Sequence, residues 1–209
     1  MQISLVNQAV QLNGSYVLRN TTIFFKSTEF LALNPNGLIP VLQDEDFSIF
    51  EGNAIMQYIA EKCGWTDLYP IDVKAHAKVN QYLHWHHTNA RLITSQVLVP
   101  LLHAKQNILT PEETVFIKAI PSLITKQVEH MEKFLVKGFV AETDYPTIAD
   151  FAAYCEFVQV ELMGIHDFSK YSKFSTWLKH MKSVPHHDEM HKPLDELLTT
   201  MDLKMKVIS

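Results

Sequence analysis

Backbone groups between Asn34 and Ile55 form the part of the sequence best suited to chemistry. The chain there reads NPNGLIPVLQDEDFSIFEGNAI. Pro40 stands between Ile39 and Val41 in a strand pattern, although proline cannot donate to a strand ladder. An X-Pro bond in this extended context, after a glycine turn, is a good candidate for the cis form. That form would turn the N–H and C=O of Ile39 outward, where they can hold a peptide in antiparallel fashion.

The helix that opens on Glu51, Gly52 and Asn53 supplies a second set of binding groups. The first N–H groups of a helix have no partner within it and lie at the positive end of its dipole, which suits a carboxylate. The Glu51 side chain can accept a hydrogen bond from an ammonium group. Each feature alone has a simpler explanation, an edge-strand proline or a helix cap. Their order and spacing predict a pocket for a small peptide that carries an amine and carboxylates.

Short elements before residue 70 must position these groups. In order along the chain, the patterns predict a helix, a strand, a short helix, a hairpin and a helix over residues 4–14, 15–25, 27–33, 39–50 and 52–64. The hairpin turns at the acidic stretch Gln43-Asp44-Glu45-Asp46. It therefore carries Pro40 at one end and leads directly into the helix start at the other.

After residue 70 the pattern is almost entirely helical. WTDLYPID, with Pro70, is interpreted as a linker. A long helix is expected from about Lys74 past Arg91, and FSTWLKHMKSVP and PLDELLTTMDLK predict the last helices. The sequence thus predicts an N-terminal domain, a linker and an all-helical domain over residues 1–65, 66–73 and 74–209.

Two capping boxes mark helix starts in the second part. TPEE pairs Thr110 with Glu113, and TIAD pairs Thr147 with Asp150. Pro121 lies inside the helix that follows TPEE and is expected to kink or interrupt it. The segment FAAYCEFVQVELMG behind TIAD is apolar nearly all round, so that helix should be central.

Composition and charge narrow the class of protein. Of the 209 residues, 47% are hydrophobic and 20% charged, an ordinary globular balance. The net charge of -5 gives no electrostatic reason to expect nucleic acid, and no run approaches the ~18 apolar residues of a membrane span. Cys63 and Cys155 have no CxxC partner, which fits a reducing compartment. MQISLVNQAV is not a secretory signal, so the expected location is cytoplasmic.

Histidines are frequent, but their spacing does not predict a metal site. They gather in the ranges 84–87 and 186–191. Adjacent histidines on a helix point to different faces, and no paired carboxylate spacing resembles a zinc site. We therefore expect no metal.

Several motifs, in order, resemble the glutathione transferase family. FLALNPNGLIPVLQDEDFSIFEGNAIMQYIAEK is similar to the family's N-terminal domain, in which an NPxGxxP turn carries a cis-proline and an E-S-x-A-I segment opens the next helix. YLHWHHTNAR is similar to the theta class, and FVAETDYPTIADFAAY and WLKHMKSVPHHDEMHKPLDEL extend the likeness over essentially the whole chain. The resemblance implies an α/β plus all-α fold, with a thioredoxin-like domain followed by an all-helical one.

The resemblance also implies a function. It describes a cytoplasmic detoxification enzyme, usually a homodimer, that conjugates reduced glutathione, its co-substrate, to small hydrophobic electrophiles. The family's glutathione site falls on Leu38, Ile39, Pro40, Glu51 and Gly52. Its electrophile site falls on His87 and Arg91. For Arg91 a second interpretation stays open, a salt bridge between helices.

The chain departs from the family at its start. The family begins with a central strand and a catalytic Ser, Tyr or Cys, whereas SLVNQAVQLNG aligns with the helix that follows them. We expect the first strand and the catalytic residue to be missing; the alternative is that MQISLV is the strand itself. Conjugation needs a donor that lowers the pKa of the glutathione thiol. Ser4 is the weak candidate for this donor.

Three further departures make the pocket less polar. Gly52 stands where the family has a serine hydroxyl, Leu38 where it often has lysine, and Phe25 where it has a polar or basic residue. These losses support an alternative function, a non-catalytic binding or scaffold protein that keeps the fold without the chemistry.

Overall fold

The structure, a computed structural model, describes residues 27–204, and the chain divides into two compact units between Tyr69 and Pro70. We call the residues up to Tyr69 the N-terminal unit and those from Pro70 the C-terminal unit. The predicted helix over 4–14 and strand over 15–25 lie outside the described residues, as does the question of a strand before Ser4.

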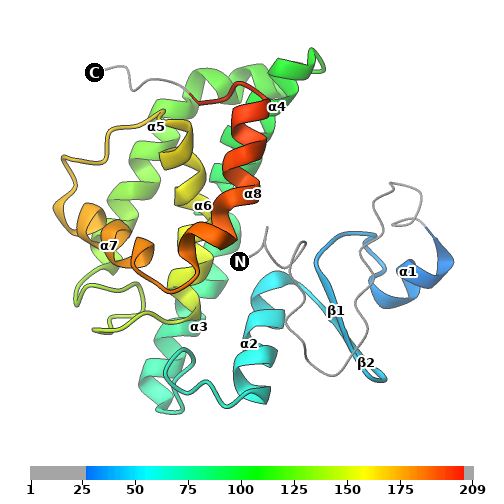
Figure 1. Cartoon of the computed structure of the whole chain (residues 1–209), viewed down its shortest axis with the longest axis vertical. Coiled ribbons are helices and arrows are strands. Elements are labelled where there is room, and N and C mark those ends of the chain that lie inside the picture. Colours follow the sequence, from blue (N-terminus) through cyan, green and yellow to red (C-terminus); the bar gives the residue numbers. More distant parts are fainter. Residues whose placement is uncertain (1–26, 205–209) are drawn as a thin grey trace. The chain divides into compact units, whose positions relative to one another are not determined.

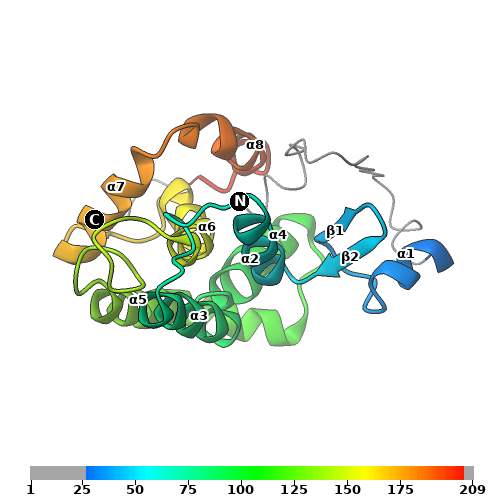
Figure 2. The same ribbon diagram turned by 90° about the horizontal axis from the view of Figure 1, so that it is seen from below.

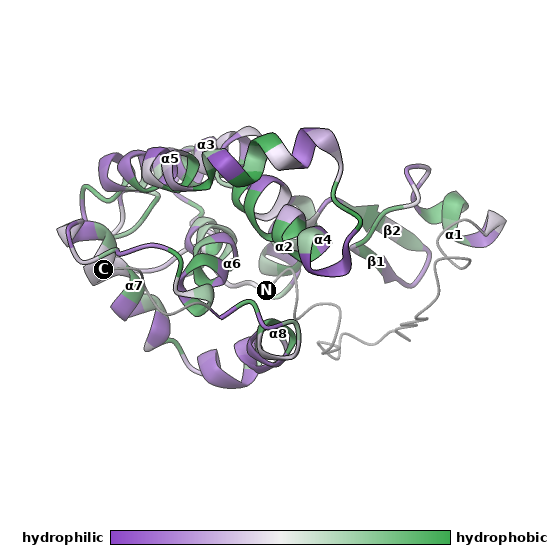
Figure 3. Ribbon diagram, turned by 90° about the horizontal axis from the view of Figure 1, so that it is seen from above, coloured by the Kyte–Doolittle hydropathy of each residue, from purple (hydrophilic) through white to green (hydrophobic). Residues whose placement is uncertain are grey.

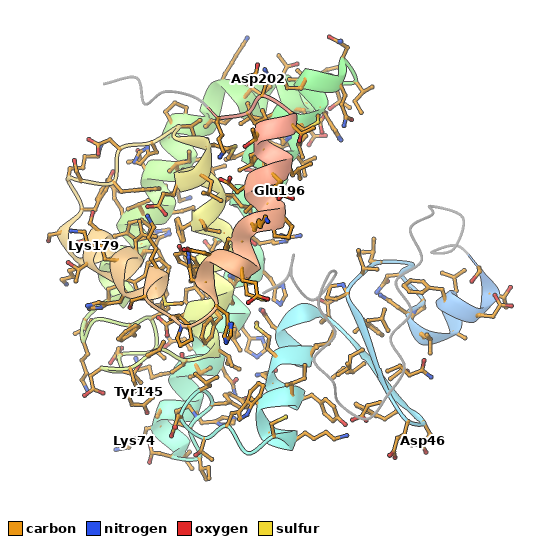
Figure 4. The ribbon with its side chains drawn as sticks, viewed as in Figure 1. Asp46, Lys74, Tyr145, Lys179, Glu196 and Asp202 are labelled. Carbon is orange, nitrogen blue, oxygen red and sulfur yellow. The ribbon has the colours of Figure 1, made fainter. Side chains whose placement is uncertain are left out.

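The described part of the N-terminal unit consists of a short helix, a hairpin and a longer helix, α1 (Thr28–Leu33), β1 (Val41–Asp44), β2 (Phe47–Phe50) and α2 (Gly52–Lys62) (Figure 1). The strands pair antiparallel, with Val41 opposite Phe50 and Asp44 opposite Phe47. Figure 4 shows Asp46 at the tip of this hairpin. The order of short helix, hairpin and helix predicted from the sequence is confirmed.

A small apolar cluster joins the hairpin to α2. Leu42 on β1 packs with Ile55 and Ile59, which lie one turn apart on α2, and Ile49 and Tyr58 cover the cluster. The spacing of four residues puts both isoleucines on one face of the helix. Burying each such side chain stabilises the fold by about 1.5–3 kcal/mol. The cluster therefore fixes where the start of α2 lies relative to the strands.

The C-terminal unit is helical. Its elements are α3 (Val73–Thr88), the π-helix η2 (Thr94–Leu98), α4 (Val99–Gln106), α5 (Pro111–Phe134), α6 (Ile148–Met163), α7 (Ser172–Lys182) and α8 (His187–Thr200). Figures 1 and 2 place α6 in the middle of this unit, and it contacts α3, η2, α7 and α8. The predicted central helix is confirmed.

The start of α6 is held by a fully buried carboxylate. Asp150 accepts hydrogen bonds from the N–H of Thr147 at 2.8 Å and from the N–H of Val140 at 2.9 Å. It also accepts one from the indole N–H of Trp177 on α7 at 3.0 Å. The predicted capping box is confirmed, as is the one at Thr110. Asp150 thus caps its own helix and ties it to two other segments.

The prediction of a helix that continues past Arg91 is too long, because α3 ends at Thr88. Asn89 closes it with a side-chain bond from Nδ2 to the carbonyl oxygen of Trp85 at 3.0 Å. Two tighter turns and then η2 follow. The N–H of Thr94 donates to the carboxylate of Glu156 on α6 rather than to a carbonyl of its own helix. A partner 62 residues away along the chain therefore takes the N–H that would otherwise bond within a regular helix at Thr94.

Prolines also act differently from expectation. Pro121 does not interrupt α5, which runs unbroken over 24 residues. The missing N–H costs one helical bond, but the Thr110 capping box and a buried stripe, which includes Ile124 and Val128, stabilise the rest. Likewise α8 begins at His187 and contains Pro193. The sequence patterns had also not predicted α4.

α7 illustrates how alternating residue types set the two faces of a helix. Phe174, Trp177 and Met181 are buried, whereas Lys179 is exposed, and Figure 3 shows the mixed hydropathy along α7. Its first turn is capped from another helix, because the N–H of Phe174 donates to the Glu132 carboxylate of α5 at 2.7 Å. None of the helices in the described range is long and apolar enough to cross a bilayer.

Candidate functional site

The turn before the hairpin is organised by Asn34. This buried side chain donates from Nδ2 to the carbonyl oxygen of Leu38 at 2.7 Å and accepts from the N–H of Asn36 at 3.0 Å. The Ile39-Pro40 peptide bond is cis, as predicted. Ile39 is 50% exposed, and no backbone hydrogen bond joins it to another described residue. The turn thus leaves the Ile39 backbone open to an extended ligand.

Glu51 begins α2 in a backbone conformation that glutamate rarely adopts. Its φ is 74° and its ψ is 113°. A non-glycine residue in such a region costs about 1–3 kcal/mol, and residues of this kind cluster at functional sites. The side chain is exposed and makes no capping bond to α2, while Gly52 is buried. The carboxylate therefore projects from the helix start, where it can accept a bond from a ligand.

The strand register brings these two features to the same end of the hairpin. Val41 and Phe50 form the hairpin pair farthest from the turn. Pro40 directly precedes Val41 and Glu51 directly follows Phe50, so both residues lie just beyond this pair. At the other end of β1, the buried Asp44 accepts hydrogen bonds from the Tyr58 hydroxyl and the Lys62 ammonium group of α2. Lys62, with help from Tyr58, lowers the pKa of Asp44. These contacts hold the hairpin and α2 as one piece.

In the C-terminal unit, Arg91 is bound to a carboxylate of the same unit. Its Nη1 lies 3.1 Å from Oε1 of Glu156, whose side chain is 1% exposed, whereas the Arg91 side chain is 44% exposed. The other carboxylate oxygen of Glu156 accepts from the N–H of Thr94 at 3.1 Å and from its hydroxyl at 2.6 Å. Burial raises the pKa of Glu156, and Arg91 and Thr94 lower it in part. The salt bridge left open from the sequence is present.

His86 lies beside this pair without joining it as a charged group. Its Nε2 is 3.7 Å from Oε1 of Glu156, and neither ring nitrogen has a hydrogen-bond partner among the described residues. Burial lowers the pKa of His86 to about 3, with smaller contributions from His87 and Arg91. His86 is therefore neutral at pH 7, and Arg91 supplies the positive charge that Glu156 faces.

The predicted site residues form two groups, one in each unit. The end of the hairpin carries Leu38, Ile39, Pro40, Glu51 and Gly52. The C-terminal unit carries His87, which is exposed in the last turn of α3, and Arg91 just after it. Ser4 and Phe25 lie outside the described residues. Within the range 27–204, no three metal-ligating side chains gather in a metal-binding arrangement.

Sequence reasoning missed three residues that organise these groups. Asn34 had a signal, since asparagine before a Pro-Asn-Gly turn commonly bonds its own backbone. Glu156 had one too, because it is an acidic residue in the middle of the apolar run YCEFVQV, and buried carboxylates need partners. Thr94 gave no signal, since its role depends on Glu156.

Comparison with known proteins gives matches in both sequence and structure. Residues 7–61 match the model of the glutathione S-transferase N-terminal domain. The chain is 31% identical over 187 residues to Glutathione S-transferase T1 of Arabidopsis thaliana, across 80% of this chain and 73% of that protein. It is 30% identical over 153 residues to Glutathione S-transferase theta-1 of Gallus gallus, across 70% of this chain and 57% of the relative. Two longer Arabidopsis thaliana relatives are matched over 30% of their length.

A solved structure is similar over most of the chain. The crystal structure of human glutathione transferase theta-2, in complex with glutathione and an unknown ligand, superposes with a TM-score of 0.73 at 27% identity. The match covers 87% of this chain and 76% of that structure. The likeness therefore includes both units.

Proposed function

Because the chain belongs to the glutathione S-transferase family and is theta-like, we propose that it conjugates reduced glutathione to small hydrophobic electrophiles. It has the fold predicted from the sequence, a thioredoxin-like α/β domain followed by an all-helical domain. We assign these domains to residues 1–65 and 74–209, joined by the linker 66–73.

In this proposal glutathione binds along the end of the hairpin. The open backbone of Ile39 pairs with the peptide backbone of glutathione, beside Pro40 and Leu38. The carboxylate of Glu51 accepts a hydrogen bond from the γ-glutamyl ammonium group, and the backbone N–H at Gly52 donates to the γ-glutamyl carboxylate. The exposure of Ile39 and the strained conformation of Glu51 support this placement.

The reaction itself is a nucleophilic substitution at carbon. The glutathione thiol loses its proton to solvent, and the thiolate sulfur attacks the electrophilic carbon. A carbon–sulfur bond forms, and the bond to the leaving group breaks with both electrons going to that group. Ser4 is our candidate for the donor that stabilises the thiolate, and His87 and Arg91 are our candidates for contact with the electrophile.

The observation that carries the proposal is the register that sets Pro40 and Glu51 at one end of the hairpin. The test is a calorimetric titration with glutathione, followed by conjugation assays on a panel of electrophiles. We expect saturable binding, and turnover above the uncatalysed rate. Binding without turnover of any electrophile would leave only the non-catalytic alternative. No binding at all would exclude the site.

The proposal extends to a homodimer that acts in detoxification in the cytoplasm, since that is the usual state of the family to which the chain belongs. Light scattering of the purified protein would measure its mass in solution. We expect twice the 24.0 kDa of one chain. A mass of one chain at micromolar concentration would rule out a stable dimer.

A further inference from the structure

The contact between Arg91 and Glu156 bears on which electrophiles this transferase accepts. Arg91 is the exposed member of the pair, with 44% of its side chain accessible, and Glu156 is the buried one, with 1% accessible. A guanidinium at the surface would by itself attract anions. Here its Nη1 is already committed to a carboxylate oxygen 3.1 Å away.

Glu156 cannot turn away from this contact without losing others. Its second oxygen is held by both the N–H and the hydroxyl of Thr94. That hydroxyl is in turn held by the side-chain amide of Gln159 on the same helix as Glu156, at 2.8 Å from Nε2. The amide also donates to the carbonyl oxygen of Cys155 at 2.8 Å. The carboxylate therefore has a fixed orientation toward Arg91.

The buried charge also has few alternatives for neutralisation. In the described part of the chain, the ion pairs of Glu156 involve Arg91 and His86, and His86 is uncharged at pH 7 because its pKa is about 3. A buried carboxylate that loses its charged partner strongly destabilises the folded protein. A ligand anion that drew Arg91 away would have to compensate for that loss. Arg91 is thus a poor receptor for anions as long as Glu156 is ionised.

We propose that Glu156 is a specificity-determining residue, which neutralises Arg91 and so makes this transferase favour neutral electrophiles over anionic ones. The inference rests on the proposed function, in which Arg91 contacts the electrophile. Glu156 touches no substrate in this account. It acts through Arg91 and is a positioning residue.

The test compares two electrophiles of nearly the same shape, 4-chloro-3-nitrobenzoate and its neutral amide. Glutathione displaces chloride from both rings, and each catalysed rate is divided by its uncatalysed rate. We expect wild type to favour the amide. In Glu156→Gln the guanidinium is released, and kcat/KM for the benzoate relative to the amide should rise on the order of tenfold, as expected for one charge-assisted hydrogen bond. The gain should appear in KM rather than in kcat.

A double variant shows whether the gain passes through Arg91. Arg91→Gln combined with Glu156→Gln removes both charges and should return the ratio to the wild-type value. A gain that survives in the double variant would place the anion elsewhere and overturn the proposal. An equal change for both electrophiles in Glu156→Gln would show a merely structural role and would overturn it as well. Glu156→Met, of similar length and without charge, replaces the Gln variant if that one does not fold.

Binding measurements separate this inference from the proposed function. If wild type turns over no electrophile of the panel, the proposed function fails, but calorimetric titration with 4-nitrobenzoate still tests Glu156. Glu156→Gln should bind this anion on the order of tenfold more tightly than wild type. Equal affinities for the two proteins would overturn the inference on its own.

Discussion

Val41 and Phe50 form the last residue pair of the hairpin, and this pair sets Pro40 and Glu51 at the same end of it. The candidate glutathione site therefore depends mainly on backbone positions, which one strand pair and one helix start determine. Of the side chains at this end, Glu51 supplies the carboxylate of the proposed site, whereas Leu38 is apolar and exposed. This explains how the site can keep its geometry although several polar residues usual in the family are absent.

Replacing Gly52 tests whether the missing hydroxyl weakens glutathione binding. Gly52→Ser adds a hydroxyl at the start of α2 that can donate to the γ-glutamyl carboxylate. We expect the dissociation constant of glutathione to fall on the order of tenfold, the effect of one hydrogen bond to a charged group. Calorimetry measures it, with Gly52→Ala as the matched control that adds a Cβ without a hydroxyl. An equal gain in both variants would exclude the hydroxyl as the cause.

The backbone of Glu51 predicts opposite changes in stability and binding. Glu51→Gly relieves the positive φ and is expected to raise the free energy of unfolding by up to about 1 kcal/mol, because glycine adopts this region freely. It also removes the carboxylate, so glutathione affinity should fall. Glu51→Gln keeps the strained backbone and should lose affinity without gaining stability. Urea unfolding and calorimetry on both variants check this. Tighter binding in Glu51→Gly would contradict the assigned role.

The buried carboxylate of Asp150 predicts a large loss of stability. Asp150→Ala leaves the buried donors of Thr147, Val140 and Trp177 without their acceptor, and each unsatisfied donor costs about 1–3 kcal/mol. We expect the free energy of unfolding to fall by about 3–5 kcal/mol. Asp72→Ala is the control, since it removes an exposed cap of α3, worth about 1 kcal/mol. Similar losses in both variants would show that burial of the network adds nothing.

His86 predicts a loss of stability on acidification. Its pKa is about 3 in the folded protein and near 6.5 in the unfolded chain. Between these two values the unfolded chain binds a proton that the folded protein does not. The free energy of unfolding therefore decreases as the pH falls from about 6.5 towards 3. The slope from this residue is up to about 1.4 kcal/mol per pH unit.

Urea unfolding of His86→Gln at several pH values checks that slope. The dependence between pH 6.5 and 5 should be shallower in the variant than in wild type, because glutamine does not titrate. His84→Gln, which removes an exposed histidine from the same helix, should keep it. Parallel pH profiles for wild type and His86→Gln would refute the prediction.

Local patterns predicted much of the fold, whereas long-range contacts decided what they missed. The hairpin, α2 and both capping boxes follow from residues a few positions apart, and so does the cis bond at Pro40. The conformation at Thr94 depends instead on Glu156, which accepts the Thr94 N–H and which no neighbour of Arg91 reveals. The same contact decides what Arg91 binds. A sequence pattern gives the residue types at a site, but not which of them are already paired.

The π-helix η2 also determines the rotation of the helix that follows it. Its backbone hydrogen bonds join residues five apart instead of four. Compared with an unbroken α-helix of the same sequence, every later side chain is therefore rotated by about 100°. Val97, Leu98 and Pro100 are buried in this arrangement, and α4 packs against α5. A relative one residue shorter between 94 and 98 would form a smooth helix that keeps the same side of α4 against α5, because the π-helical turn absorbs one extra residue. A length difference of one residue here would thus change the hydrogen bonding of η2 while the packing of α4 against α5 stays the same.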